Sequence, residues 1–406
     1  GFSRLLPVPM KMDQTTMKFN TNDITLTNAH LHLGKSDFML NGEIKRIRQA
    51  MLRGGKLQGN FSLTSDYIDC NQLMKAMNSG MQYTELHSAT TDQSVIDEEN
   101  LVTMDTHTLQ DSIATATLDT TDRVFVIPAY LDMTLHTDAK KIDFKDVELS
   151  NVLGEVIIRD QSINLSNLKM DSNIGRGHMT MFYTAKDESG ASAGFDIDME
   201  NVMVEKLIGL YPAIDTLVPM LRSFEGVVDC QITATCKMDS VMSLDLPSLN
   251  SACYLHGENM VLLDGETFTE ISKTLMFKNK KRNVIDSISV DLAIKDNKIE
   301  VFPFLVEMDR YKVAVGGTHN LDMTFNYHLS VLKSPVPFKL GIDITGNLDD
   351  FKYKIVKCRY KDLFKPAKEA ELDSTRTNIR KEIRESIRNQ IKETAPELVS
   401  SLSSNH

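Results

Sequence analysis

Alternation of apolar and polar residues runs through much of the chain and predicts a protein built mainly of β-strands. From residue 24 to residue 40 apolar side chains alternate with Thr and His, with a break near Asn28, and an Asn41-Gly42 pair predicts a hairpin turn. The same period of two returns in five short segments, at 131–135, 142–144, 156–158, 163–165 and 179–181. Turns are predicted between them at Lys140-Lys141, Asn151, Asp160-Gln161 and Gly175-Arg176-Gly177, so the pattern is typical of an antiparallel meander.

The second half of the chain continues the sheet and ends in a long helix. Strands are predicted at 287–292, 298–302, 311–315, 321–329 and 338–344, and short helices at 44–52, 204–211 and 267–277. A charged helix is predicted from Pro366 to Thr394, with Pro396 ending it. Its apolar stripe falls at four-residue spacing, at Ile379, Ile383, Ile387 and Ile391.

One local pattern recurs along the chain. The segment Phe61–Met74 reads as a strand that stops at the acidic residue Asp66 and passes into a short helix, with Asp69 or Asn71 placed to cap it. The pattern returns without a gap at Phe195–Ile208, and a shorter version lies at Leu255–Leu263. Such recurrence predicts a repeat architecture, in which one long sheet is assembled from similar units.

These patterns divide the chain into five sections. Residues 1–77 form a first sheet section with a short helix, and 78–122 are rich in Ser, Thr, Asp and Glu, which predicts a polar loop or partly disordered insertion. Residues 123–225 and 226–360 form a second and a third sheet section, and 361–406 form the charged helix and tail. The predicted fold class is mainly β, a long curved antiparallel repeat sheet with a few short helices and a long C-terminal helix.

Composition narrows the function classes. The 406 residues carry a net charge of −11, which argues against nucleic acid as a partner. The chain has no Trp, which weakens a carbohydrate-binding hypothesis, and five Cys without a CxxC pair, which disfavours a zinc knuckle. Cys230 and Cys236 share one predicted strand face but lie too far apart to bridge, so small buried thiols are the expected state.

No signal peptide and no apolar run of membrane-spanning length is visible in the sequence. The chain begins at Gly1 without Met, which we interpret as a fragment or a processed form. Any membrane anchor would then lie in a missing N-terminal part.

Two motifs with catalytic or metal-binding associations have simpler explanations. Gly190-Ala-Ser192-Ala-Gly194 matches the serine-hydrolase pattern, but that motif needs a strand before Ser and a helix after it, whereas here a turn precedes and a strand follows. His30 and His32 share one strand face and could form half of a metal site, but no further paired His exists, so a solvent-facing pair is favoured. We therefore expect no catalytic residues, no metal site and no cofactor.

The remaining polar and glycine motifs also favour structural roles. Asp66, Glu200 and Glu258 occupy equivalent repeat positions, which lie along a sheet and not across a cleft as glycosidase carboxylates do, so turn or cap roles are favoured. Gly175-Arg176-Gly177 and Gly316-Gly317 complete no phosphate-binding loop and are expected to form turns. The Ile stripe of the C-terminal helix could dock on a membrane or a partner, but charges of both signs flank it, which favours packing on its own protein.

The long sheet must bury its apolar face, and helical segments are too few to cover it. Either the sheet folds into a closed sandwich, or it curls and leaves a concave apolar groove. Met-rich strands suit a groove that holds flexible acyl chains, but Met also fills irregular cores, so the residues alone leave both open. The expected groove-lining residues are Phe61, Leu63, Leu131, Met133, Leu135, Val156, Ile158, Ile163, Leu165, Met179, Met181, Phe195 and Ile197.

The chain resembles the AsmA-like family, especially the C-terminal region of the forms found in Bacteroidetes. The likeness rests on the segments 33–42 with 59–73, on 126–135 with 147–154, and on 344–350, and it covers about residues 20–355. After Leu348-Asp-Asp350 the family usually places Pro, and here Phe351 follows, which puts the local chain end in doubt.

The resemblance implies a non-catalytic protein of the Gram-negative periplasm that serves outer-membrane biogenesis. Proteins of this type are similar to bridge-like lipid transfer proteins, hold acyl chains in a hydrophobic groove and are anchored in the inner membrane by an N-terminal helix. The implied partners are phospholipid or another acyl lipid, the inner membrane and envelope proteins. The alternative is a closed β-sandwich scaffold of the envelope that binds protein partners.

Overall fold

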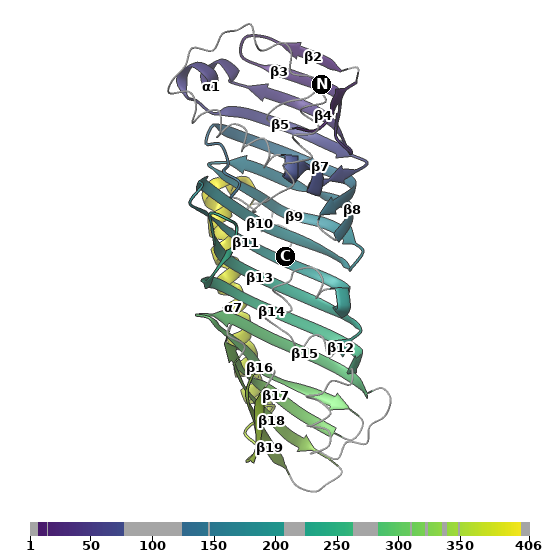
Figure 1. Ribbon diagram of the computed structural model, residues 1–406, viewed down its shortest axis with the longest axis vertical. Coiled ribbons are helices and arrows are strands. Elements are labelled where there is room, and N and C mark those ends of the chain that lie inside the picture. Colours follow the sequence, from purple (N-terminus) through teal and green to yellow (C-terminus); the bar gives the residue numbers. More distant parts are fainter. Residues whose placement is uncertain are drawn as a thin grey trace.

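The computed structural model shows one open, curved sheet of 20 strands with a long helix along one side (Figure 1). It describes residues 7–398, with gaps at residue 14 and at 77–123, 145–146, 207–223, 263–282, 309–310, 321–323, 335–338 and 348–349. The first part of the sheet comprises β1 (Met10–Met12), β2 (Thr16–Phe19), β3 (Ile24–Leu33), β4 (Ser36–Lys45), β5 (Leu57–Ser65) and β6 (Ile68–Asp69), with α1 (Ile47–Arg53) between β4 and β5.

The middle of the sheet comprises β7 (Leu131–Phe144), β8 (Val147–Arg159), β9 (Ser162–Ser172), β10 (Arg176–Asp187), β11 (Gly190–Met203), β12 (Phe224–Glu225), β13 (Val227–Asp239) and β14 (Leu244–Leu262). The last part comprises β15 (Asn283–Lys295), β16 (Lys298–Met308), β17 (Tyr311–Asn320), β18 (Phe325–Lys333), β19 (Leu340–Gly346) and β20 (Phe351–Val356). The helix α7 (Pro366–Thr394) has the bounds that the sequence predicts, and the mainly β fold class is confirmed.

Neighbouring strands pair in chain order, because most of them are joined as antiparallel hairpins. The sheet departs from the predicted antiparallel pattern on one side of β7. β5 and β7 run parallel, from Leu57 opposite Leu131 to Ser65 opposite Ala139, and β6 also runs parallel to β7. Parallel neighbours need a crossover connection, which no alternation pattern within either strand can indicate.

Several predicted turns lie inside strands. Asn41-Gly42 belongs to β4, and the hairpin turn lies at Gly34-Lys35 instead. A side chain at Gly42 would collide with the carbonyl oxygen of Asn60 on β5, so the glycine allows close strand approach. Lys140-Lys141 lies within β7, and Gly316-Gly317 lies within β17. A side chain at Gly316 would collide with Pro303 of β16, and one at Gly317 with the carbonyl oxygen of Asn326 on β18.

Five asparagines in the left-handed conformation lie at β-bulges within strands and not at turns. Their φ angles lie between 47° and 57°, and the residue after each is buried. Asn side chains tolerate this region of φ/ψ space, and a bulge re-aims the following side chain by inserting one extra residue. These pairs are Asn28-Ala29, Asn151-Val152, Asn167-Leu168, Asn201-Val202 and Asn259-Met260. By contrast, Asp160 and Gln161, at φ 52° and 59°, form the predicted turn between β8 and β9.

The recurring strand-to-helix pattern is present where the structure describes it. After β6 a helical segment begins at residue 70, and the Asp69 carboxylate accepts a hydrogen bond from the Gln72 amide at 2.9 Å, as the capping prediction requires. After β11 a helical segment begins at residue 204. The predicted insertion 78–122, the predicted helix 267–277 and most of the predicted helix 204–211 lie outside the described residues.

Candidate functional site

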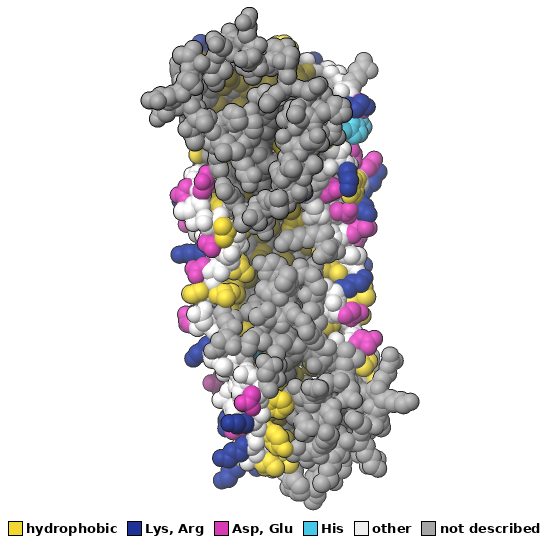
Figure 2. All heavy atoms as spheres, in the orientation of Figure 1, with side chains coloured by type: hydrophobic (Ala, Val, Ile, Leu, Met, Phe, Trp, Pro, Cys, Tyr) yellow, Lys and Arg dark blue, Asp and Glu magenta, His cyan; other side chains and the backbone are white. Residues whose placement is uncertain are grey.

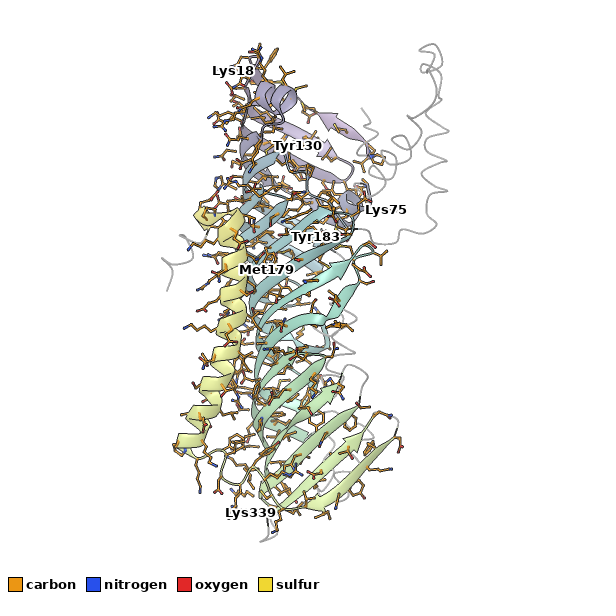
Figure 3. The ribbon with its side chains drawn as sticks, turned by 90° about the vertical axis from the view of Figure 1, so that its left-hand side faces the viewer. Lys18, Lys75, Tyr130, Met179, Tyr183 and Lys339 are labelled. Atoms are coloured by element: carbon orange, nitrogen blue, oxygen red, sulfur yellow. The ribbon has the colours of Figure 1, made fainter. Side chains whose placement is uncertain are left out.

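The two faces of the sheet are different surfaces. On β8, Ile157 points to the face that α7 covers, whereas Val156 and Ile158 point to the opposite face. We call the first the helix face and the second the apolar face. In side view α7 runs along the helix face over much of the sheet (Figure 3).

The apolar face carries a row of large apolar side chains that crosses six strands. Each residue of the row is the cross-strand neighbour of the next, from β5 through β7, β8, β9 and β10 to β11. Because strands are about 4.8 Å apart, the row is about 24 Å long and runs along the long axis of the molecule. Its members are Phe61, Leu135, Val156, Leu165, Met181 and Phe195.

Parallel rows flank this one on the same face. Met133, Ile158 and Ile163 are successive neighbours on β7, β8 and β9, and Met179 lies opposite Ile197 on β10 and β11. The other two predicted residues, Leu63 and Leu131, lie on the same face of β5 and β7. All thirteen predicted residues are half-buried. Figure 2 looks onto this side of the molecule and shows patches of apolar side chains in the parts that are not drawn in grey.

The apolar face continues beyond the residues that the sequence singled out. On β13 to β18 many of its side chains are buried in one hydrophobic cluster, and others pack against that cluster partly buried. Members of this cluster include Cys230, Leu255, Leu292, Val301, Phe304 and Tyr327. The alternation of apolar residues in segments 287–292 and 298–302 is the signal that could have added part of it to the prediction.

A pocket extends the apolar face at the N-terminal end of the sheet. Its volume is about 410 Å³, and its lining is almost entirely apolar. Two of the lining residues, Met51 and Tyr130, are 79% and 55% exposed, so the pocket opens to solvent. The lining residues are Ile24, Ile44, Ile47, Ala50, Met51, Leu57 and Tyr130, the last labelled in Figure 3.

The helix face is occupied by α7 through a central apolar stripe. Ile383, Ile387 and Ile391 are buried against Ile157 and Phe182 of the sheet. This packing confirms the interpretation of the isoleucine stripe as a contact with the protein's own sheet.

Arginines beside that stripe pair with aspartates of the sheet. Arg380 donates to Asp291 at 2.7 Å, and Arg384 donates to Asp196 at 2.9 Å and to Asp198 at 3.3 Å. Burial raises the pKa of both Asp291 and Asp196, although the guanidinium groups act in the opposite direction. The polar helix face is thus covered by a helix that supplies charge partners for its carboxylates.

The motifs with catalytic associations lie in structural settings. Ser192 is inside β11, opposite Thr184 on β10 and Lys237 on β13, so it has no strand-turn-helix elbow. Asp66 pairs with Lys140 at 2.6 Å, while Glu200 and Glu258 are exposed beside the bulges at Asn201 and Asn259. The three acids therefore do not share a cleft, as the repeat argument expected.

The cysteines are all free thiols. Cys230 is buried on β13, and burial, assisted by the charges of Asp198 and Asp229, raises its pKa to about 12. Such a thiol is protonated and inert at neutral pH.

No protein-family model and no curated protein sequence matches the chain. Among the helices in the described parts of the chain, none combines the length and apolar character needed to cross a membrane.

Proposed function

We propose that the protein binds acyl lipids on its apolar face and acts in lipid transfer without catalysing a reaction. The observation that carries the proposal is the row of half-buried apolar side chains from Phe61 to Phe195, which crosses six strands on the face opposite α7. A row about 24 Å long exceeds the acyl length of one leaflet, which is about half of the roughly 30 Å hydrocarbon core of a bilayer.

The energetics suit a ligand that binds and moves. Each buried CH₂ contributes about 0.8 kcal/mol, so a long acyl chain can be held without specific polar contacts. The rows present chemically similar side chains on successive strands. An acyl chain that moves along a row from one strand to the next therefore meets an equivalent surface. Met133, Met179 and Met181 add unbranched, adaptable side chains to that surface.

The resemblance to AsmA-like proteins supports a particular setting for this activity. We propose that the protein works in the periplasm of a Gram-negative bacterium, anchored at the inner membrane and serving outer-membrane biogenesis. Phospholipid is the proposed cargo, and envelope proteins are the proposed protein partners.

Native mass spectrometry of the purified chain, followed by solvent extraction, tests the proposal. Phospholipid should co-purify at a reproducible stoichiometry with the parent chain. Met181→Glu and Leu165→Glu should each remove most of it, because a carboxylate placed in the row must be desolvated by the bound acyl chain. Circular dichroism should show an intact sheet in both variants.

Lys169→Glu is the matched control, because Lys169 is exposed on β9 and points to the helix face. This variant introduces the same carboxylate on the same strand as Leu165 and should keep its lipid. Equal lipid content in all variants would contradict the proposal. A clean apo mass that persists after incubation with phospholipid vesicles would also contradict it and would favour a scaffold for protein partners.

A further inference from the structure

A cluster of three metal-ligating side chains lies at the N-terminal end of the sheet, away from the apolar rows. Asp13, His30 and His32 each offer one ligand atom, and these atoms all lie within 4.8 Å of one another. His30 and His32 point to the same face of β3 because they are two residues apart in a strand. Asp13 follows the edge strand β1, which pairs with the same stretch of β3.

The backbone holds the carboxylate beside the imidazoles. The Asp13 amide donates to the carbonyl oxygen of His30 at 2.9 Å, and Lys11 lies directly opposite His32 in the β1–β3 ladder. The carboxylate then lies 3.3 Å from Nε2 of His32, and Lys11 pairs with its other oxygen at 2.8 Å. The two imidazole rings meet edge to face, with centroids 5.9 Å apart. The three ligand groups are therefore preorganised by one strand pairing.

The donor set selects one class of ion. Two imidazole nitrogens and one carboxylate oxygen suit Zn²⁺ and neighbouring transition metals, which accept such sets in tetrahedral geometry with a fourth position for water. Ca²⁺ and Mg²⁺ prefer sites built mainly from oxygen ligands, and here the cluster contributes one carboxylate. All three residues are half-buried, so an ion can reach them from solvent.

We propose that Asp13, His30 and His32 bind one divalent transition-metal ion of the zinc class. The ion joins the end of β1 to β3 and thereby fastens the edge strand to the sheet. The sequence suggested only the His pair as half of a site, and the strand pairing supplies the missing carboxylate. The site is independent of lipid binding, since His30 and His32 alternate with Ala29 and Leu31 on β3 and point to the face opposite the apolar rows.

Isothermal titration calorimetry of the metal-stripped full chain with Zn²⁺ tests the proposal. We expect one saturable site per chain, and little or no binding of Mg²⁺. His30→Ala and His32→Ala should each weaken the affinity for Zn²⁺ by about 10–100-fold or more. Loss of a residue that only hydrogen-bonds to a metal ligand already weakens binding by about 10–100-fold. Asp13→Asn should weaken it by about tenfold or more, because the amide keeps the shape but loses the charge.

His136→Ala is the matched control, since His136 is exposed on β7 beside Glu155 and lies outside the cluster. This variant should bind Zn²⁺ like the parent chain. Hydrogen exchange of the β1 amides gives a second readout. Zn²⁺ should slow this exchange in the parent chain but not in any of the three cluster variants. Absence of saturable binding, or equal affinity in the parent and the cluster variants, would overturn the proposal.

Discussion

The helix face and the apolar face are built from the same strands but are completed in different ways. The helix face carries polar groups such as Asp196, Asp198 and Asp291, and α7 covers it with a narrow isoleucine stripe flanked by arginines. The apolar face of β5 to β11 carries rows of half-buried Leu, Ile, Met and Phe without such charge partners. The difference shows that the long helix is placed by specific ion pairs as well as by apolar burial, and that the more hydrophobic face is the one that α7 leaves uncovered.

The sharpest test of this difference uses two adjacent residues of β8. Ile157 is fully buried under α7, whereas Ile158 is half-buried on the apolar face. Ile157→Ala should lower the free energy of unfolding by about 3 kcal/mol, because it leaves a cavity that α7 cannot fill. Ile158→Ala should cost only about 1 kcal/mol, because its methyl groups are already partly exposed.

Urea unfolding of both variants measures this contrast, with the slope of the transition as a check that the same cooperative unit unfolds. If Ile157→Ala and Ile158→Ala lower the free energy of unfolding equally, the two faces are equally covered in solution, and the contrast between them is wrong.

A second test removes one charge partner from the helix face. Arg380 donates to Asp291 and to Gln231, at 2.7 Å and 3.0 Å, and its guanidinium lies over the Tyr254 ring. Arg380→Ala should cost about 2 kcal/mol, because it weakens the compensation of a buried carboxylate. Hydrogen exchange of the α7 amides should increase accordingly.

The exposed neighbour provides the control for that test, and Lys381→Ala should change stability by less than about 0.5 kcal/mol. Adding Asp291→Asn to Arg380→Ala should recover part of the loss, since the buried carboxylate, left with Arg376 as its ion-pair partner at 3.4 Å, is removed. If Arg380→Ala behaves like Lys381→Ala, the arginines do not place the helix.

A pH titration tests the contribution of the carboxylate at the end of the helix face. Burial opposes ionisation of Asp132, but hydrogen bonds from Arg159 and Gln58 outweigh it and hold the pKa of Asp132 below its usual value. A lowered folded-state pKa stabilises the protein above the unfolded pKa of about 3.9, and this contribution is lost as pH falls through the folded pKa.

The stability difference between the parent chain and Asp132→Asn should therefore be constant at neutral pH and should shrink below about pH 4. Urea unfolding at a series of pH values measures it. A difference that stays constant down to pH 2.5 would show that Asp132 titrates normally in the folded protein.

The smallest expected effect concerns the apolar face where it becomes buried. Cys230 is 1% exposed on β13, with its pKa raised to about 12 by burial. Iodoacetamide at pH 8 should therefore leave Cys230 unmodified in the folded chain and modify it in concentrated urea, as read by peptide mass spectrometry. Rapid labelling in the folded chain would show that the apolar face is accessible to solvent at Cys230 of β13 as well.

Much of the two-faced sheet could be predicted because alternation is a local property. All thirteen residues expected to line the groove lie on one face, and α7 begins and ends where Pro366 and Thr394 predicted. The turn predictions failed more often, because a left-handed asparagine suits a turn and a bulge equally well. Asn151 was expected to end a strand, but β8 continues through it because strands are available to pair on both sides.

The sequence alone determined which side chains alternate, where the long helix lies and which residues share a strand face, since each of these follows from neighbours a few positions apart. Only the tertiary structure decided that β5 and β7 run parallel, that α7 covers the polar face, and that Arg384 meets Asp196. It also decided that Asp13 joins His30 and His32. These outcomes depend on how segments far apart in the chain pack together. A local sequence pattern does not indicate the packing energy of such contacts.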